Sequence, residues 1–419
     1  MSASPPVPGR VPGPGVAGLA RAALILATLA LFVSEHYVHY AMGAMALLGV
    51  VDLARHREDL RDPTARALGL LFALLWLPMA IAWPGAADRA HSGEVVWPYL
   101  HLLPAAWFVT RSCLDPAVRR LVTQGAALLV AFMAIDALIQ FVWHVDLFGY
   151  PYKRGVLKGL FYPKQRLGLF LAVLAPLYVD TVLNWCRRHA WLWLLLVPMV
   201  VAVLMSQKRS AWIMLVFGAL FHGLLWARRR RAHGARPRLL LATLLLGLAL
   251  GLAALNPALR ARLVDTSGVF STDAATFDKA SAYRLTLWRT GVRIFADHWL
   301  TGVGPRGFRH VYADYAPPDD FWLKRTGQGQ THPHQLMLEI AIETGVIGLA
   351  AFVAFYVLLL RRLLRAAPRD DMPVWLMATA VAWLPLNAHL AFYGAYWTAL
   401  AWLTLAVGLA ETRGADLPA

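Results

Sequence analysis

Residues Thr331–Gly348 read THPHQLMLEIAIETGVIG and join a long polar segment to a long apolar run. The first position of a helix tolerates proline, because the N–H group there would be unsatisfied in any case. Pro333 therefore predicts a helix start, and Thr331 or His332 is expected to cap it. On this interpretation His334 lies in the first turn of the helix.

The predicted helix continues through LAAFVAFYVLLL to Arg361. A helix N-terminus carries partial positive charge and free N–H groups, which suit a phosphate ligand. The same field disfavours a protonated imidazole, so His334 is expected to be neutral and able to accept a proton. A polar residue at the end of a membrane helix is also common as an interfacial cap, so position alone leaves both interpretations open.

Composition places the chain among membrane proteins. Of its 419 residues, 59% are hydrophobic and only 15% are charged, and the mean hydropathy is +0.52. These values indicate an all-α polytopic membrane protein rather than a soluble domain. Residues 1–15 are rich in Pro and Gly and are expected to form a disordered arm without a cleavable signal peptide. Cys113 and Cys186 form neither a disulfide framework nor a metal-ligand spacing.

About twelve apolar runs approach the length of roughly 20 residues that a membrane-spanning helix needs. They are Val16–Ser34, Tyr37–Ala54, Ala67–Trp83, Trp97–Val109, Leu121–Trp143, Leu167–Asn184, Trp191–Met205, Ala211–Trp226, Leu239–Leu255, Gln335–Leu360, Val374–Leu390 and Ala395–Leu409.

Arginine placement predicts the orientation of these spans. With the N-terminus inside, every second loop is basic, as the positive-inside rule requires. The inner clusters are Arg55, Arg57 and Arg61; Arg119 and Arg120; Arg187 and Arg188; Arg228 to Arg231; and Arg361, Arg362 and Arg365. The predicted organisation is a cytoplasmic arm (1–15), nine spans (16–255), an outer loop domain (256–333), three spans (334–410) and a cytoplasmic tail (411–419). The outer loop is long enough that it should have helical structure of its own.

Two shorter outer loops also carry cations, against the insertion rule. Asp146–Arg166 interleaves Tyr and Phe with lysine and arginine, and the SQKRSA loop is basic as well. The cations are Lys153, Arg154, Lys158, Lys164 and Arg166 in the first loop, and Lys208 and Arg209 in the second. Anionic ligands at the outer surface explain them. For the first loop, simple contact with lipid headgroups explains them equally well.

Within the outer loop domain, Asp278–Trp299 is predicted to form an amphipathic helix. Its apolar stripe, at three- and four-residue spacing, consists of Leu285, Trp288, Val292, Phe295 and Trp299. At ~100° per residue, Arg284 borders this stripe and is expected to be half-buried, where it needs an anionic partner. Arg289 and Arg293 are expected to be solvated or lipid-facing. The glycines of the following TGVGPRGF segment indicate a tight turn rather than a phosphate loop.

Acidic and histidine pairs give weaker signals. Asp319–Asp320 is interpreted as a solvated turn, and a metal site at His332 and His334 is not expected. Glu339 and Glu343 lie one helical turn apart in an apolar helix, where carboxylates are costly in lipid, so they should face the protein interior. Ordering of a site and plain structural pairing explain them equally well.

Together these segments resemble the O-antigen ligase and polymerase superfamily, in the ligase branch. YRLTLWRTGVRIFADHWLTGVGPRGF followed by HPHQLMLEIAIETGVIGL is similar to its R-x-x-x-W, GxG…F, His-amide and E-x-G-x-x-G elements, and SQKRSAW is similar to its Ser-Arg element. The matching residues are Arg209, Arg284, Trp288, Gly302, Gly304, Phe308, His334, Gln335, Leu338, Glu343, Gly345 and Gly348. FYPKQRLGLF departs from the family's F-x-N-P-N element, since Lys164 and Gln165 stand where asparagine is usual.

The resemblance implies a GT-C-like bacterial inner-membrane enzyme with a periplasmic active site. Such ligases move O-polysaccharide from undecaprenyl diphosphate to lipid A–core, with inversion and without a metal or other cofactor. His334, Arg284 and Arg209 are the implied catalytic residues. The candidate substrate-binding residues are Lys208, Gln335, Lys153, Arg154, Lys158, Lys164, Arg166, Trp288 and Tyr283. The implied partners are donor, acceptor and membrane lipids, with no nucleic acid.

Other functions fit parts of the pattern. An O-antigen or exopolysaccharide polymerase and a protein O-oligosaccharyltransferase resemble the same superfamily. A lipid-linked sugar transporter is a different class, but it would be expected to show paired halves with broken helices near mid-membrane. Here the unusual residues gather at one face and in one loop, which favours an enzyme.

Overall fold

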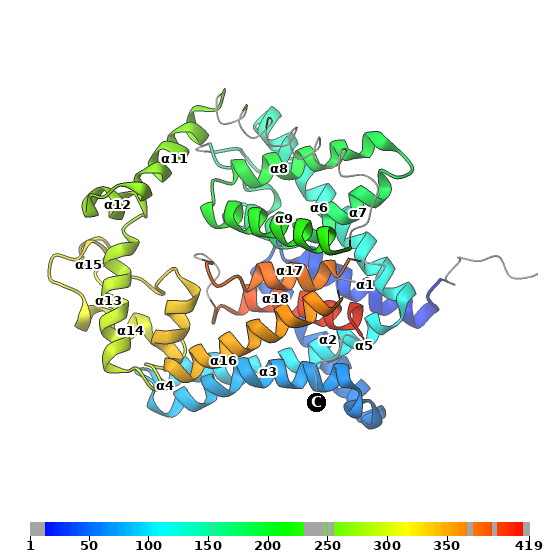
Figure 1. The fold of residues 1–419 in the computed structure, drawn as a ribbon, viewed down its shortest axis with the longest axis horizontal. Helices are drawn as coiled ribbons and strands as arrows, with labels where there is room; N and C mark the ends of the chain where they lie inside the picture. Colours follow the sequence, from blue (N-terminus) through cyan, green and yellow to red (C-terminus); the bar gives the residue numbers. More distant parts are fainter. Residues whose placement is uncertain are drawn as a thin grey trace, which may run out of the picture.

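The computed structural model describes residues 13–153, 155–229, 247, 251, 255–366, 372–387 and 392–413. This part of the chain is helical and contains no strand, only two isolated β-bridges. The predicted all-α class is therefore confirmed (Figure 1).

The helices fall into a long first bundle segment, an outer group and a last segment. The first contains α1 (Val16–Leu31), α2 (Glu35–Arg55), η1 (Arg57–Arg61), α3 (Pro63–Ala82), η2 (Trp83–Gly85), α4 (Arg89–Tyr99), α5 (Leu102–Leu114), α6 (Pro116–Trp143), η3 (Gly159–Phe161), α7 (Leu167–Trp185), η4 (Ala190–Leu195), α8 (Leu196–Met205) and α9 (Arg209–Arg229). The outer group contains α11 (Pro257–Ser267), η5 (Gly268–Phe270), α12 (Ala274–Ala280), α13 (Arg284–Asp297), α14 (Phe308–Tyr315) and α15 (Phe321–Thr326). The last contains α16 (Leu336–Ala366), α17 (Val374–Ala382) and α18 (Ala395–Glu411).

Six helices of the described chain are long and apolar enough to cross a membrane. They are Glu35–Arg55, Pro63–Gly85, Pro116–Trp143, Leu167–Trp185, Arg209–Trp226 and Leu336–Ala366. α1 and the Ala190–Met205 segment are apolar but shorter. The predicted span Trp97–Val109 is divided between α4 and α5, and Leu239–Leu255 lies almost wholly outside the described residues. The chain is thus a helical membrane protein, with six candidate spans among its described residues.

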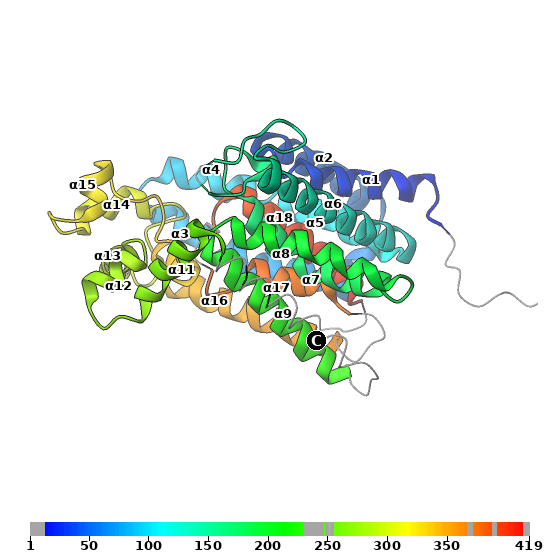
Figure 2. The same ribbon diagram turned by 90° about the horizontal axis from the view of Figure 1, so that it is seen from above.

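The bundle core is centred on α17 and α18, which other helices surround in both views (Figures 1 and 2). Trp375 and Trp402, from these two helices, are completely buried. A buried indole N–H needs a hydrogen-bond acceptor. Trp402 Nε1 donates to the Tyr99 hydroxyl at 2.9 Å, and Trp375 Nε1 donates to Thr123 Oγ1 at 2.8 Å. These bonds tie the last two helices to α4 and α6.

The outer helices α11–α15 gather at one end of the bundle (Figures 1 and 2). They have a small core of their own, as expected for a polar segment of this length. It consists of Leu287, Ile294, Val303, Phe308 and Tyr312, together with Ile342 from α16. Because α16 contributes to this core, the outer helices are fixed against the membrane bundle.

α13 buries a different face from the predicted one. It begins at Arg284 because Ala282 and Tyr283 are left-handed and separate it from α12. The predicted stripe is wrong, since Val292 and Trp299 are each 56% exposed. The buried residues of α13 are Leu287, Thr290, Gly291 and Ile294. The reason is steric: a Cβ on Gly291 would lie 2.8 Å from Ile342 Cδ1, so this small residue brings α13 onto α16.

α16 is sharply kinked rather than continuous. At Gly345 the backbone has φ 65° and ψ −165°, a region that only glycine enters readily. The segment that follows α13 enters this kink: Val346 N donates to Trp299 O at 2.7 Å and Val303 N donates to Ile342 O at 2.9 Å. A Cβ on Gly345 would lie 2.1 Å from Leu300 O. The Gly302–Gly307 turn is thereby held against α16, which confirms its interpretation as a tight turn.

Candidate active site

The segment that precedes α16, residues 331–335, is a bent, non-helical strap and not a first helical turn. His334 has a left-handed backbone with φ 53°. Gln335 caps the helix instead, since its Oε1 accepts the Leu338 N–H at 2.5 Å. The predicted start at Pro333, with a cap at Thr331 or His332, is therefore wrong. The reason is local: the turn at His334 places the Gln335 side chain over the free N–H groups of α16.

Two outer helices hold the strap through hydrogen bonds to its backbone. Trp288 Nε1 of α13 donates to Pro333 O at 3.0 Å. Arg309 Nη2 of α14 donates to Thr331 O at 3.4 Å. The His332 and His334 rings are in edge contact, with centroids 4.0 Å apart. The outer helices α13 and α14 thus help to position the two imidazoles, together with α16.

The surroundings of the strap are strongly positive. Burial, and then Arg309, Arg306 and Arg284, lower the pKa of His332 to about 4. His332 is consequently neutral at pH 7. The positive field that the sequence assigned to a helix start comes instead from guanidinium groups on three separate segments.

Four of the predicted basic residues come together on one side of the strap. Burial, and then Arg262, Arg284 and Lys158, lower the pKa of Lys208 to about 8. Burial, and then Arg209 and Arg262, lower the pKa of Arg284 to about 10. Arg284 is half-buried, as predicted from its place on α13. We call Lys158, Lys208, Arg209, Arg262 and Arg284 the donor cluster.

The donor cluster has few protein partners. Arg209 Nη1 donates to the Ala280 carbonyl oxygen. The Nε atoms of Arg209 and Arg262 are buried and have no hydrogen-bond partner within the described ranges. Asp265 is the acid that faces Arg209. Closely packed cations with unused donors suit a ligand of high negative charge, because buried charges need partners.

Sequence reasoning missed Arg262, and also Arg306 and Arg309 on the other side of the strap. Arg306 and Arg309 lie in or beside the GPRGF motif, so the motif itself could have drawn attention to them. Arg262 lies on α11, whose sequence has no marked apolar stripe. Only the tertiary fold brings this arginine to Lys208 and Arg284.

Several predicted binding residues lie elsewhere. Arg166 pairs with Glu35 at 2.8 Å and its guanidinium lies over the Tyr396 ring, 4.0 Å from the centroid. Lys164 acts on the same Glu35 carboxylate. Tyr283 stacks on Phe321 of α15 with a centroid distance of 3.6 Å. Lys153 is exposed, and Arg154 lies outside the described residues.

The two buried glutamates of α16 anchor neighbouring segments. Glu339 and Glu343 are 3% and 1% exposed, so they face the interior as expected. Glu343 accepts the Arg306 N–H, and Glu339 accepts the Phe392 N–H at 3.1 Å. Glu343 therefore orders the turn that carries Arg306. Asp320 is also buried, at 2% exposed, and accepts the Tyr312 hydroxyl at 2.9 Å, so the predicted solvated turn is wrong at this residue.

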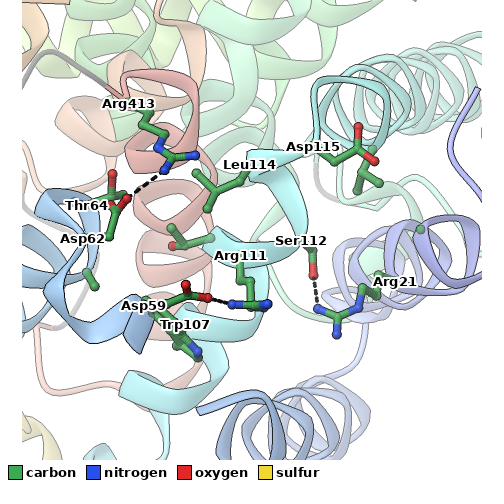
Figure 3. A pocket seen from close by; sticks show the side chains of 14 residues that line it. Arg21, Asp59, Asp62, Thr64, Trp107, Arg111, Ser112, Leu114, Asp115 and Arg413 are labelled. Carbon is green, nitrogen blue, oxygen red and sulfur yellow. Dashed lines mark hydrogen bonds and ion pairs between the residues drawn. The ribbon is translucent and has the colours of Figure 1, made fainter. Parts of the chain in front are cut away.

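A pocket of about 420 Å³, lined in part by charged side chains, lies at the opposite end of α3 (Figure 3). Thr64, at the start of α3, lines it, whereas the segment after α3 contacts the Gly302–Gly307 turn through the Ala87–Val303 hydrogen bond. The 20 residues of α3 span about 30 Å. The arginines at this pocket are neutralised by Asp52, Asp59 and Asp62, which bind Arg21, Arg111 and Arg413 respectively. The pocket is therefore a network of ion pairs, unlike the donor cluster.

Comparison with known proteins places these features in a family. A search of the curated proteins found no match. A family model described as O-Antigen ligase matches residues 194–353, which include the Lys208–Arg209 loop, the outer helices, the strap and the kink of α16. The resemblance noted from the sequence is confirmed over these residues, which match the O-antigen ligase superfamily.

Proposed function

We propose that this protein is an O-antigen ligase, which transfers O-polysaccharide from undecaprenyl diphosphate to lipid A–core in lipopolysaccharide biosynthesis. The observation that carries the proposal is the donor cluster beside the histidine strap. Cleavage of a sugar–phosphate bond increases the charge on the diphosphate leaving group, and preorganised cations stabilise such a transition state. The match of residues 194–353 to the O-antigen ligase family model supports the same reaction class.

In the proposed mechanism the donor diphosphate binds Arg209, Arg262 and Arg284. An acceptor hydroxyl attacks the anomeric carbon of the first donor sugar from the face opposite the leaving group. Its proton passes to the His334 imidazole, the C–O bond to phosphate breaks, and undecaprenyl diphosphate leaves. The product has inverted configuration. His334 takes the proton or orients the hydroxyl, and the arginines carry the charge that a metal ion supplies in other enzymes.

We further propose a GT-C-like arrangement of about twelve spans in the bacterial inner membrane, with the strap and the donor cluster in the periplasm. The alternation of arginine-rich loops supports this orientation. Cysteine labelling tests it: positions 207 and 275 should react from the periplasm and positions 232 and 367 from the cytoplasm. Labelling of position 275 from the cytoplasm would contradict the proposed site.

The surface glycan of a deletion strain tests the reaction itself. Loss of a ligase leaves complete polysaccharide chains on the lipid carrier and an uncapped core. Single repeats on the core would instead identify the protein as a polymerase. An unchanged core with polysaccharide missing from a surface protein would identify a protein O-oligosaccharyltransferase.

A further inference from the structure

A second group of basic side chains lies on the α14 side of the strap. Arg306 belongs to the Gly302–Gly307 turn, Arg309 and His310 belong to α14, and His91 belongs to α4. The His91 and His310 rings are in edge contact, with centroids 5.3 Å apart. Arg309 reaches the strap itself through Thr331. Two segments that are distant in sequence, residues 302–315 and α4, thus present cations and imidazoles to one place.

This arrangement is fixed by backbone contacts. Ser92 Oγ of α4 donates to Pro305 O at 2.8 Å, and Ala87 N donates to Val303 O at 2.9 Å. A Cβ on Gly304 would lie 2.2 Å from Ala86 Cβ, so only glycine permits this approach. The hydrogen bond from Arg306 N to Glu343 fixes the same turn to α16. The group is therefore preorganised, as a binding site requires.

Several polar atoms in and beside this group make no hydrogen bond within the described part of the chain. Arg309 Nε, His91 Nε2 and His332 Nε2 are buried and lack a hydrogen-bond partner among the residues that the structure describes. Among the nearby acids, Asp88 lies 3.7 Å from His310 Nε2 and Glu94 lies 3.6 Å from His91 Nδ1. The buried Glu339 and Glu343 carboxylates act on Arg306 and Arg309. A buried polar group without a partner costs about 1–3 kcal/mol. A phosphate group, with several acceptor oxygens, would satisfy these donors together.

This second group is separate from the donor cluster. The charges that act on Arg284 come from Arg209 and Arg262, whereas those that act on His91 come first from Arg306 and Arg309. Arginines of both groups lower the pKa of His332. Trp288 and Arg309, which hold the strap, belong to two different helices, α13 and α14. An anion on each side of His334 is the arrangement that a transfer between two charged lipids needs.

We propose that Arg306, Arg309 and His91 form an acceptor-anion site, which binds a phosphate monoester of the saccharide acceptor. The site would orient the acceptor so that its hydroxyl meets His334 while the donor diphosphate occupies the donor cluster. This inference rests on the proposed ligase function, because it assigns the acceptor to one side of the strap. It also explains why two basic groups, rather than one, surround a single pair of histidines.

The experiment uses the full chain in nanodiscs of phosphatidylcholine and a lipid A–core acceptor in two forms, phosphorylated and enzymatically dephosphorylated. Arg309→Gln should raise the KM for the phosphorylated acceptor about tenfold or more, because a charge-assisted contact is lost. Its KM for the dephosphorylated acceptor and its donor KM should match those of wild type. Arg309→Lys keeps the charge and should fall between wild type and Arg309→Gln. Arg289 is an exposed arginine of α13, and Arg289→Gln is the matched control. It should change neither the acceptor KM nor the donor KM.

Binding of each acceptor form without donor is measured by titration calorimetry, so the result does not depend on transfer. Equal binding of both forms by wild type, or a donor KM that rises with the acceptor KM in Arg309→Gln, would overturn the acceptor-anion site. A phospholipid headgroup is the other source of phosphate. If Arg309→Gln changes only the response to added phosphatidylglycerol, the site binds lipid and the proposal fails. Absence of transfer to either acceptor by wild type would instead refute the ligase function.

Discussion

Trp288 Nε1 donates a 3.0 Å hydrogen bond to the carbonyl oxygen of Pro333, the residue before His334. Through this bond α13, which carries Arg284, also fixes the strap that carries the proposed proton acceptor. In the proposed mechanism, α13 and this one hydrogen bond therefore fix the distance between the donor diphosphate, bound at Arg284, and His334. Errors in such positions reduce rates strongly, because catalysis depends on orientation.

Trp288→Phe should therefore lower kcat about tenfold and leave the donor KM within twofold of wild type. The ring volume is largely kept, but the bond to Pro333, worth about 1 kcal/mol, is lost. Steady-state transfer with purified protein measures both constants. Trp299→Phe, at a 56% exposed position, is the control and should behave as wild type. Equal kcat losses in the two variants would show that the bond does not position the strap.

Substitutions of the arginines should reduce transfer to different extents, depending on whether the arginine belongs to the donor cluster. Arg284→Ala and Arg209→Ala should abolish transfer in a protein that still inserts, and Arg262→Ala should raise the donor KM by about tenfold. Lysine at position 284 should restore little activity, since it lacks the planar bidentate fork. Arg293→Ala should be mild, because Arg293 is exposed. Transfer assays on membranes with matched protein levels measure these effects. Equal losses at positions 284 and 293 would contradict the assignment.

His332 predicts a pH dependence of stability. Its pKa is lowered from 6.5 to about 4 in the folded protein. Between these values the unfolded chain binds a proton that the folded chain does not, so stability is fully present above about pH 6.5 and falls towards pH 4. His332→Gln should reduce this fall, as measured by thermal unfolding in detergent at pH 7.5 and pH 5. The same loss of melting temperature in wild type and variant would show that His332 is not shielded by burial and arginines.

The kink of α16 predicts a strict requirement for glycine. Gly345→Ala adds a Cβ that would lie 2.1 Å from Leu300 O, at a backbone conformation that costs other residues about 1–3 kcal/mol even without a clash. The variant should melt several degrees lower and lose transfer, because the Gly302–Gly307 turn cannot dock. Gly69→Ala is the control, since nothing lies within 4 Å of a Cβ there. A Gly345→Ala protein with wild-type melting and activity would contradict this role.

Apolar run length predicted the helical membrane class, and the length of the polar segment predicted a structured outer loop. Both predictions depend on the composition of long segments, and individual tertiary contacts do not alter that composition. The buried face of α13 could not be predicted in this way. Both of its faces carry apolar residues, and the close approach permitted by Gly291 determines which face meets α16.

In the candidate site too, some features could be predicted from the sequence and others could not. The sequence named Lys208, Arg209 and Arg284, and the fold brings them together with Arg262, although their roles stay predictions. It also named Lys164 and Arg166, which the fold directs towards Glu35. The helix start was misplaced because proline favours the first helical position, whereas the left-handed turn at His334 places the start after Gln335. Convergence of separate segments is a tertiary property that spacing along the chain does not show.

Transfer by the purified chain in nanodiscs, from polysaccharide-linked undecaprenyl diphosphate to lipid A–core, is the most direct test of the proposed function. Wild type should form the ligated product, and should do so in EDTA, because charge neutralisation is assigned to arginines. His334→Ala should bind the donor with wild-type affinity and form no ligated product, whereas His332→Ala should keep most activity. Full activity of His334→Ala, or activity lost in EDTA and restored by a divalent metal ion, would contradict the account.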